Sequence, residues 1–232
     1  MAIGNSDMTG VRAALERPAP SEILLRNPVV AVLRARHAEE YPPVIAALAD
    51  GGVRSIELTL STAGVVELLP HLIRDFGADV EIGVGTITEP AEARTALDAG
   101  ARFLVTPVTD REIVLAAVAH GIPVFPGGLT PTELLQGWRA GATAVKVFPA
   151  STVGPGYISQ LRGPFPDLQV IPSGGVAIED AAGWISAGAL AVSLGGPLLG
   201  DAFKGGDLGM LSGRAAEVSR LVAAALAARG AR

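Results

Sequence analysis

Residues 141–149 read GATAVKVFP, a glycine followed by a short apolar run that carries a single lysine. Glycine at the position after a helix takes the left-handed conformation that ends the helix, and β-branched residues favour the strand that follows. The stretch therefore predicts a helix-to-strand transition with Lys146 in the middle of a buried strand.

The same transition recurs along the chain at a regular period. Glycines 20 to 25 residues apart precede short apolar runs, at Gly52, Gly77, Gly100, Gly121, Gly141, Gly163 and Gly188. The runs are VRSIEL (53–58), DVEIGV (79–84), RFLVTP (102–107), IPVFPG (122–127), TAVKVFP (143–149), LQVIPSGG (168–175) and LAVSLGG (190–196), and VVAVLR (29–34) comes before them all. Eight strands alternating with helices predict an α/β fold, the (β/α)8 TIM barrel.

The segments between the runs have apolar residues at helical spacing, which predicts helices over 39–50, 64–76, 89–99, 109–120 and 210–228. No linker or shift in composition divides the chain, so we expect one barrel domain over residues 21–232. Residues 1–20 are expected to form an N-terminal leader, a helical extension in which residues 9–17 make two turns before Pro18. A doubly wound open sheet is the rival architecture, but it often has a glycine-rich loop after its first strand, and here Arg34-Ala35-Arg36 follow instead.

Composition excludes several classes of function. The net charge is −5 and no basic run is present, so nucleic acid is not expected as a partner. The absence of cysteine excludes disulfides, thiolate metal sites and a cysteine nucleophile. The sequence has neither a secretory signal nor a long apolar window, so we expect a cytoplasmic enzyme without membrane contact. His37, His71 and His120 lack metal-ligand spacing, and no metal is expected.

Lys146 is the residue that most strongly suggests chemistry. It is one of two lysines, since sixteen of the eighteen basic residues are arginine. An ammonium inside an apolar strand must find a partner or lose its proton, and a deprotonated lysine attacks carbonyl compounds. We therefore hypothesise that Lys146 forms a Schiff base.

A carboxyl group is expected beside this amine. Side chains alternate along a strand, so Glu57 and Thr59 share one face of their strand, and Lys146 and Phe148 share one face of theirs. If both faces point into the barrel, Glu57 can move protons during imine chemistry. The alternative is a structural Glu–Lys pair, although a buried pair contributes little net stability. Asp75, Asp79 and Glu81 are expected to be solvated.

Active sites of TIM barrels lie at the C-terminal ends of the strands. Polar or loop-forming residues at those ends are Arg34, Thr86, Thr106 and Pro107. The loops after the last two strands are PSGG (172–175) and SLGG (193–196), where backbone N–H groups could hold a phosphate, with a helix expected to start near Ile178. Together the two Gly-Gly pairs predict a phosphorylated substrate.

Taken in order, VVAVLR, GGVRSIELTLST, VGTIT, FLVTP, KVFPAS, PSGGV and SLGGPL resemble the class I, Schiff-base aldolases that act on 2-keto-3-deoxy-6-phosphogluconate or 4-hydroxy-2-oxoglutarate. The resemblance spans residues 27–199. It implies that Lys146 is the Schiff-base lysine and Glu57 the general acid/base. It further implies that Arg34, Thr86, Pro107, Phe148 and Ser173 bind the substrate, and that Gly174, Gly175, Gly195 and Gly196 bind its phosphate.

The resemblance also implies pyruvate and glyceraldehyde 3-phosphate as products, no cofactor and a homotrimer. Three positions depart from the family pattern: Ser61 stands where some members have arginine, Ser173 where threonine is usual, and Pro197 where serine is frequent. Arg34 could supply the charge missing at Ser61. Because of these departures the related 6-phosphogalactonate aldolase remains an alternative, as does a broad 4-hydroxy-2-oxoglutarate aldolase. A phosphosugar isomerase or epimerase, or a non-catalytic scaffold, are alternatives of other classes.

Overall fold

The computed structural model describes residues 16–230, in which strands and helices alternate. The strands are β1 (Val29–Leu33), β2 (Ser55–Thr59), β3 (Glu81–Gly85), β4 (Leu104–Val105), β5 (Val124–Phe125), β6 (Gly127–Gly128), β7 (Val145–Val147), β8 (Val170–Pro172) and β9 (Val192–Leu194). The α-helices are α1 (Glu22–Arg26), α2 (Tyr41–Asp50), α3 (Val65–Phe76), α4 (Pro90–Asp98), α5 (Arg111–Ala119), α6 (Pro131–Arg139), α7 (Gly156–Arg162), α8 (Ala181–Ser186), α9 (Gly196–Leu199) and α10 (Leu208–Gly230). Short 3-10 helices are η1 (Ala38–Glu40), η2 (Ala150–Thr152) and η3 (Ala202–Lys204).

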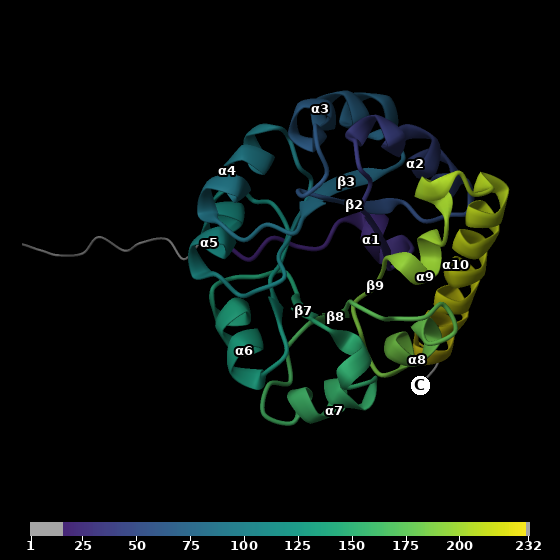
Figure 1. Cartoon of the computed structure of the whole chain (residues 1–232). Helices are drawn as coiled ribbons and strands as arrows, with labels where there is room; N and C mark the ends of the chain where they lie inside the picture. Colours follow the sequence, from purple (N-terminus) through teal and green to yellow (C-terminus); the bar gives the residue numbers. More distant parts are fainter. Residues whose placement is uncertain (1–15, 231–232) are drawn as a thin grey trace, which may run out of the picture.

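The strands curl into a ring surrounded by helices (Figure 1). Parallel pairing runs in the order β5-β4-β3-β2-β1-β9, and a second parallel set runs β6-β7-β8. The two sets meet on one side at a bridge between Ser173 and Ser193, and on the other at Pro126, which separates β5 from β6. The fold is therefore α/β and TIM-barrel-like, and the open doubly wound alternative is wrong.

The sequence predicted a single strand over residues 122–127, where the structure has two short strands. Proline has no N–H to donate to a sheet, so pairing is interrupted at Pro126. The carbonyl of Pro126 still accepts from the Lys146 N–H at 2.8 Å, which keeps this run beside β7. The predicted helices over 39–50, 64–76, 89–99, 109–120 and 210–228 are confirmed within about two residues at most ends, which is the usual uncertainty of helix boundaries.

The inside of the ring has its own apolar core, distinct from the layer between strands and helices. Buried side chains of this inner core are Val30, Phe103, Val105, Phe125, Ala144, Ile171 and Ala191. Leu24 of α1 packs with them and is 2% exposed. Because α1 precedes β1, it closes the N-terminal end of the ring, and the C-terminal end is the one left for a site.

The five described residues before α1's cap are attached to the neighbouring α6 and β7 region. The Arg17 guanidinium donates to the carbonyls of Trp138 and Ala142 and lies 3.5 Å from the centroid of the Trp138 ring. The carbonyl of Pro18 accepts from the Thr143 hydroxyl at 2.8 Å. The helix expected over 9–17 lies almost wholly outside the described residues. None of the helices within 16–230 is long and apolar enough to cross a membrane.

Glu81 was expected to be solvated, and that expectation is wrong. It lies on β3 at the closed end of the ring, is 6% exposed and accepts a hydrogen bond from the Ser55 hydroxyl. Burial raises the pKa of its carboxyl group, while hydrogen bonds from Ser55 and Ser21 oppose the rise. The strand period explains the burial, because Glu81 shares its face with Gly83 and Gly85, which point inward.

We predict that Glu81→Gln raises the free energy of unfolding near neutral pH by on the order of 1 kcal/mol. A carboxyl group whose pKa is raised on folding binds more protons in the folded state, so the wild type loses stability as pH rises from the ordinary carboxyl pKa through the raised one. The neutral amide removes this dependence and can still bond to Ser55. Urea denaturation of both proteins from acidic to neutral pH measures the difference, and equal pH dependence would contradict the assignment.

Candidate active site

Lys146 lies at the centre of β7 and is 7% exposed, so its predicted burial is confirmed. Its backbone is paired on one side with Gly127 and on the other with Ile171. Its amino nitrogen lies 4.8 Å from the centroid of the Phe148 ring. The backbone of Thr106 and Pro107 packs closely against Gly127 on the neighbouring strand. A Cβ at Gly127 would come within 2.6 Å of it.

Glu57 lies in β2 and is 1% exposed, so its predicted burial is confirmed as well. Its carboxylate crosses the neighbouring strand at Gly85, where any Cβ would overlap it. Its Oε2 atom is buried and has no hydrogen-bond partner among the described residues. A buried carboxylate oxygen without a partner is costly, and such groups usually have a catalytic or ligand-related explanation.

Lys146 and Glu57 are close enough to influence each other, yet form no direct ion pair in the described part of the chain. Burial lowers the pKa of the Lys146 amine, the charge of Glu57 raises it, and that of Arg34 lowers it. Burial raises the pKa of Glu57, and the charges of Lys146 and Arg34 oppose that rise. For both groups desolvation is the largest effect, so each is driven toward its neutral form.

The other predicted residues follow their strands at the C-terminal end of the ring. Arg34 follows β1, is exposed, and acts electrostatically on both Glu57 and Lys146. Thr86 follows β3 and is half-buried, with a φ of 62°. The left-handed region is unfavourable for a β-branched residue, and such strain is concentrated at functional sites. Pro107 follows β4 and is half-buried, whereas Thr106 is fully buried and bonds to the Val108 carbonyl.

The two glycine loops are neighbours but differ in what covers them. The Ser173 hydroxyl bonds to that of Ser193 at 3.3 Å, which joins the ends of β8 and β9. Cβ atoms at Gly174 and Gly175 would come within 2.8 Å of Phe148 and 2.7 Å of Ser151. Gly195 and Gly196, by contrast, line a cavity of about 350 Å³. The helix predicted near Ile178 begins at Ala181, because residues 178–180 form a turn first.

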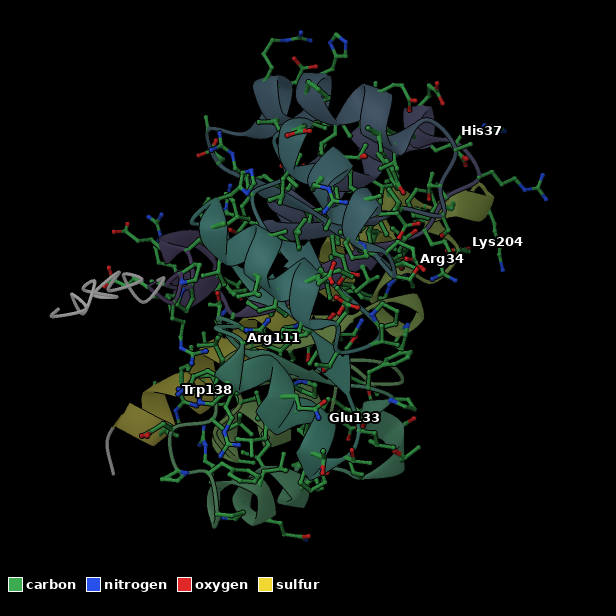
Figure 2. All side chains as sticks on the ribbon, turned by 90° about the vertical axis from the view of Figure 1, so that its left-hand side faces the viewer. Arg34, His37, Arg111, Glu133, Trp138 and Lys204 are labelled. Atoms are coloured by element: carbon green, nitrogen blue, oxygen red, sulfur yellow. The ribbon has the colours of Figure 1, made fainter. Side chains whose placement is uncertain are left out.

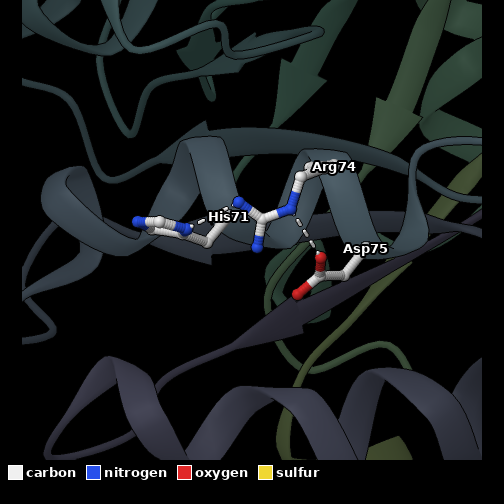
Figure 3. Close-up of polar contacts among 3 residues, drawn as sticks. All are labelled: His71, Arg74 and Asp75. Atoms are coloured by element: carbon white, nitrogen blue, oxygen red, sulfur yellow. Dashed lines mark hydrogen bonds and ion pairs between the residues drawn. The ribbon is translucent and has the colours of Figure 1, made fainter.

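The remaining candidates are exposed side chains. All three histidines are exposed, and His71 contacts Arg74 on the surface of α3, where Arg74 also pairs with Asp75 (Figure 3). Ser61 is exposed and donates to the Thr59 hydroxyl. Sequence reasoning did not single out Gly83, Gly85 or Ser193. The alternation of glycine in GVG (83–85) was the available signal, because glycines two apart in a strand leave one face open for side chains from neighbouring strands.

Comparison with known proteins identifies the family. The model described as KDPG and KHG aldolase matches residues 21–211. The chain is 34% identical to 2-dehydro-3-deoxy-6-phosphogalactonate aldolase of Escherichia coli K12, over 74% of this chain and 84% of that protein. It is 32% identical to 2-dehydro-3-deoxy-phosphogluconate aldolase of Dickeya dadantii, over 87% and 95%.

A solved structure shows the same similarity. The KDPG aldolase of Legionella pneumophila, with pyruvate captured as a covalent carbinolamine intermediate, has a TM-score of 0.77 and 28% identity, over 84% of this chain and 96% of that one. The chain belongs to the KDPG and KHG aldolase family, and its activity is that of an aldolase, a carbon–carbon lyase. The isomerase, epimerase and scaffold alternatives receive no support from these relatives.

We predict that Lys146 reacts with an amine reagent at a lower pH than an ordinary lysine, and at a lower pH still in Glu57→Gln. The first effect follows from burial of the amine, and the second from losing the carboxylate charge that raises its pKa. Competitive acetylation across pH, read by peptide mass spectrometry, measures both, with a lysine in a short model peptide as reference amine. Glu67→Gln, on the surface of α3, is the matched control, and an unchanged profile in Glu57→Gln would contradict the coupling.

Proposed function

We propose that the protein is a class I aldolase that reversibly cleaves 2-dehydro-3-deoxy-6-phosphogluconate to pyruvate and glyceraldehyde 3-phosphate, and that it also accepts 4-hydroxy-2-oxoglutarate. The observation that carries the proposal is the buried, unpaired arrangement of Lys146 and Glu57 inside the ring. A buried pair that served stability would be expected to form a direct, fully hydrogen-bonded contact. In this proposal the substrate binds between the two groups.

The amine and the acid have complementary roles in this proposal. The neutral Lys146 amine attacks the C2 ketone, and loss of water from the resulting carbinolamine gives a protonated imine. Glu57 donates the proton that the departing water requires, through a bridging water molecule. As a carboxylate it then accepts the proton of the C4 hydroxyl while the C3–C4 bond breaks.

The protonated imine supplies the electron sink for this step. Electrons from the C3–C4 bond move to the imine nitrogen, which releases glyceraldehyde 3-phosphate and leaves an enamine on Lys146. Protonation of C3 and hydrolysis of the imine then release pyruvate and restore the free amine. Each proton that Glu57 takes up is returned within one cycle. Because the protonated imine is itself the electron sink, the proposed reaction needs no metal or cofactor.

The residues around the pair are assigned to substrate binding. Arg34 provides a positive charge for the carboxylate, in place of the arginine that Ser61 replaces. Thr86 and Pro107 line the pyruvate portion, and Phe148 packs beside the imine. Ser173 is assigned to a substrate hydroxyl. The backbone at Gly174, Gly175, Gly195 and Gly196 is assigned to the phosphate. We also propose a single barrel domain over 21–232 with a leader over 1–20, assembled as a cytoplasmic homotrimer.

Trapping with pyruvate tests the central assignment. Borohydride reduction in the presence of pyruvate should leave a reduced adduct on Lys146, found by peptide mass spectrometry. Lys146→Met should give neither adduct nor cleavage because it has no nucleophile, with its circular dichroism unchanged. Glu57→Gln should slow cleavage on the order of 10²-fold through loss of proton transfer. An adduct on Lys204, or none at all, would sink the Schiff-base proposal, and normal turnover by Glu57→Gln would remove the acid/base assignment.

The galactonate-series epimer is the second candidate substrate, favoured by the 34% identity to the Escherichia coli enzyme. We predict a higher kcat/KM for the gluconate series, because Ser173 keeps the hydroxyl group that the usual threonine offers. Ser173→Ala should reduce the ratio of kcat/KM for the gluconate epimer to kcat/KM for the galactonate epimer about tenfold, which is the effect of losing one hydrogen bond in a substrate site. Measuring kcat/KM for both epimers tests this preference. A higher value for the galactonate series would make the galactonate epimer the favoured substrate.

A further inference from the structure

A cationic rim lies at the mouth of the ring, beyond the ends of β1 and β9. Arg34 and Lys204 line the 350 Å³ cavity that also contains Gly195 and Gly196. The same two cations, together with Arg36, line an adjoining cavity of about 550 Å³. Figure 2 places Arg34 and Lys204 at the same edge of the molecule, although 170 positions separate them in the sequence.

One carboxylate, that of Glu40, lies beside this rim, but it forms no direct ion pair with the three cations. No ion pair involves Arg34, Arg36 or Lys204 within residues 16–230. Glu40 lines the larger cavity, but its Oε1 atom accepts from the N–H groups of Arg36 and His37 at 3.0 and 2.8 Å. In a protein of net charge −5, such a cluster of cations attracts an anion.

The position of Lys204 is set by the packing of η3. Phe203, the preceding residue, stacks edge-on against the buried Tyr41 with ring centroids 5.9 Å apart. The Lys204 N–H donates to the Asp201 carbonyl at 2.7 Å, and Gly205 then ends η3 with a φ of 80°. These contacts anchor the backbone at the rim, and the exposed lysine side chain extends from it.

The backbone at the start of α9 leaves the anion with few donors. Pro197 has no N–H, and the N–H groups of Leu198 and Leu199 both donate to the Gly195 carbonyl at 3.0 Å. Residues 197–199 therefore offer no free backbone donor to a phosphate. A side-chain ammonium lining the same cavity can supply what this loop lacks, because an ammonium binds phosphate as a compact charge with three donors.

We propose that Lys204 is a substrate-binding residue that contacts the phosphate in the cavity beside Gly195 and Gly196, and so determines preference for phosphorylated substrates. This proposal rests on the proposed function and adds to it a residue outside the recognised motifs. Arg34 lines the same cavity, but its charge also acts on Lys146 and Glu57, whereas that of Lys204 acts on neither, so the phosphate selectivity is assigned to Lys204.

Kinetics with two substrates test the assignment on the full chain. For 2-dehydro-3-deoxy-6-phosphogluconate, Lys204→Met should raise KM about tenfold, the effect of losing one charge-assisted contact. For the unphosphorylated 2-dehydro-3-deoxygluconate it should change KM far less, and Lys204→Arg should restore most of the preference. Arg26→Met, which removes an exposed cation at the opposite end of β1, is the matched control and should leave both values unchanged. An equal change for both substrates, or none, would overturn the proposal.

Inorganic phosphate separates this proposal from the proposed function. 31P NMR can measure phosphate binding to the wild type and to Lys204→Met, and this measurement does not depend on turnover. Weaker phosphate binding by Lys204→Met supports the role of Lys204. It does so even if pyruvate leaves no adduct on Lys146, because a missing adduct would contradict only the aldolase mechanism. If the adduct forms while phosphate binds equally to both proteins, or to neither, the aldolase stands and the role of Lys204 is wrong.

Discussion

Burial of two ionisable groups inside one ring of strands is the constraint on which the site depends. Transfer of an ion into a protein interior costs on the order of several kcal/mol, and Lys146 and Glu57 both lie where that cost applies. No direct ion pair between them offsets it within the described chain. The interior therefore favours a neutral amine and a protonated acid, which are the forms that imine chemistry uses first.

The rest of the ring maintains this environment. The apolar inner core and Leu24 close the N-terminal end, which leaves the mouth as the open end of the ring. Gly85 and Gly127 have no side chain beside Glu57 and Lys146. The Glu57 carboxylate takes the space at Gly85, and the backbone of Thr106 and Pro107 takes the space at Gly127. Small residues on the inner face thus determine how closely the reactive groups approach.

The mouth divides into two regions with different chemistry. Lys146 lies beside the aromatic ring of Phe148, at the end of the ring where the half-buried Thr86 and Pro107 follow their strands. Beside β9, the Gly195–Gly196 loop opens onto a cavity lined by two cationic side chains, Arg34 and Lys204, among apolar ones. The Gly174–Gly175 loop is more covered, because Phe148 and Ser151 lie against its α-carbons. A substrate with a keto acid at one end and an anion at the other fits this division.

The sequence by itself determined the repeating order of strands and helices, the burial of Lys146 and Glu57, and the family, because glycine spacing, side-chain alternation and short motifs are local properties. Only the tertiary structure decided that Pro126 divides one strand, that Glu81 is buried, and that Lys204 joins Arg34 at one cavity. Each of these depends on contacts between segments far apart in the chain. Local patterns do not encode such contacts, since closing the ring sets which inward-facing residues meet and which loops share a rim.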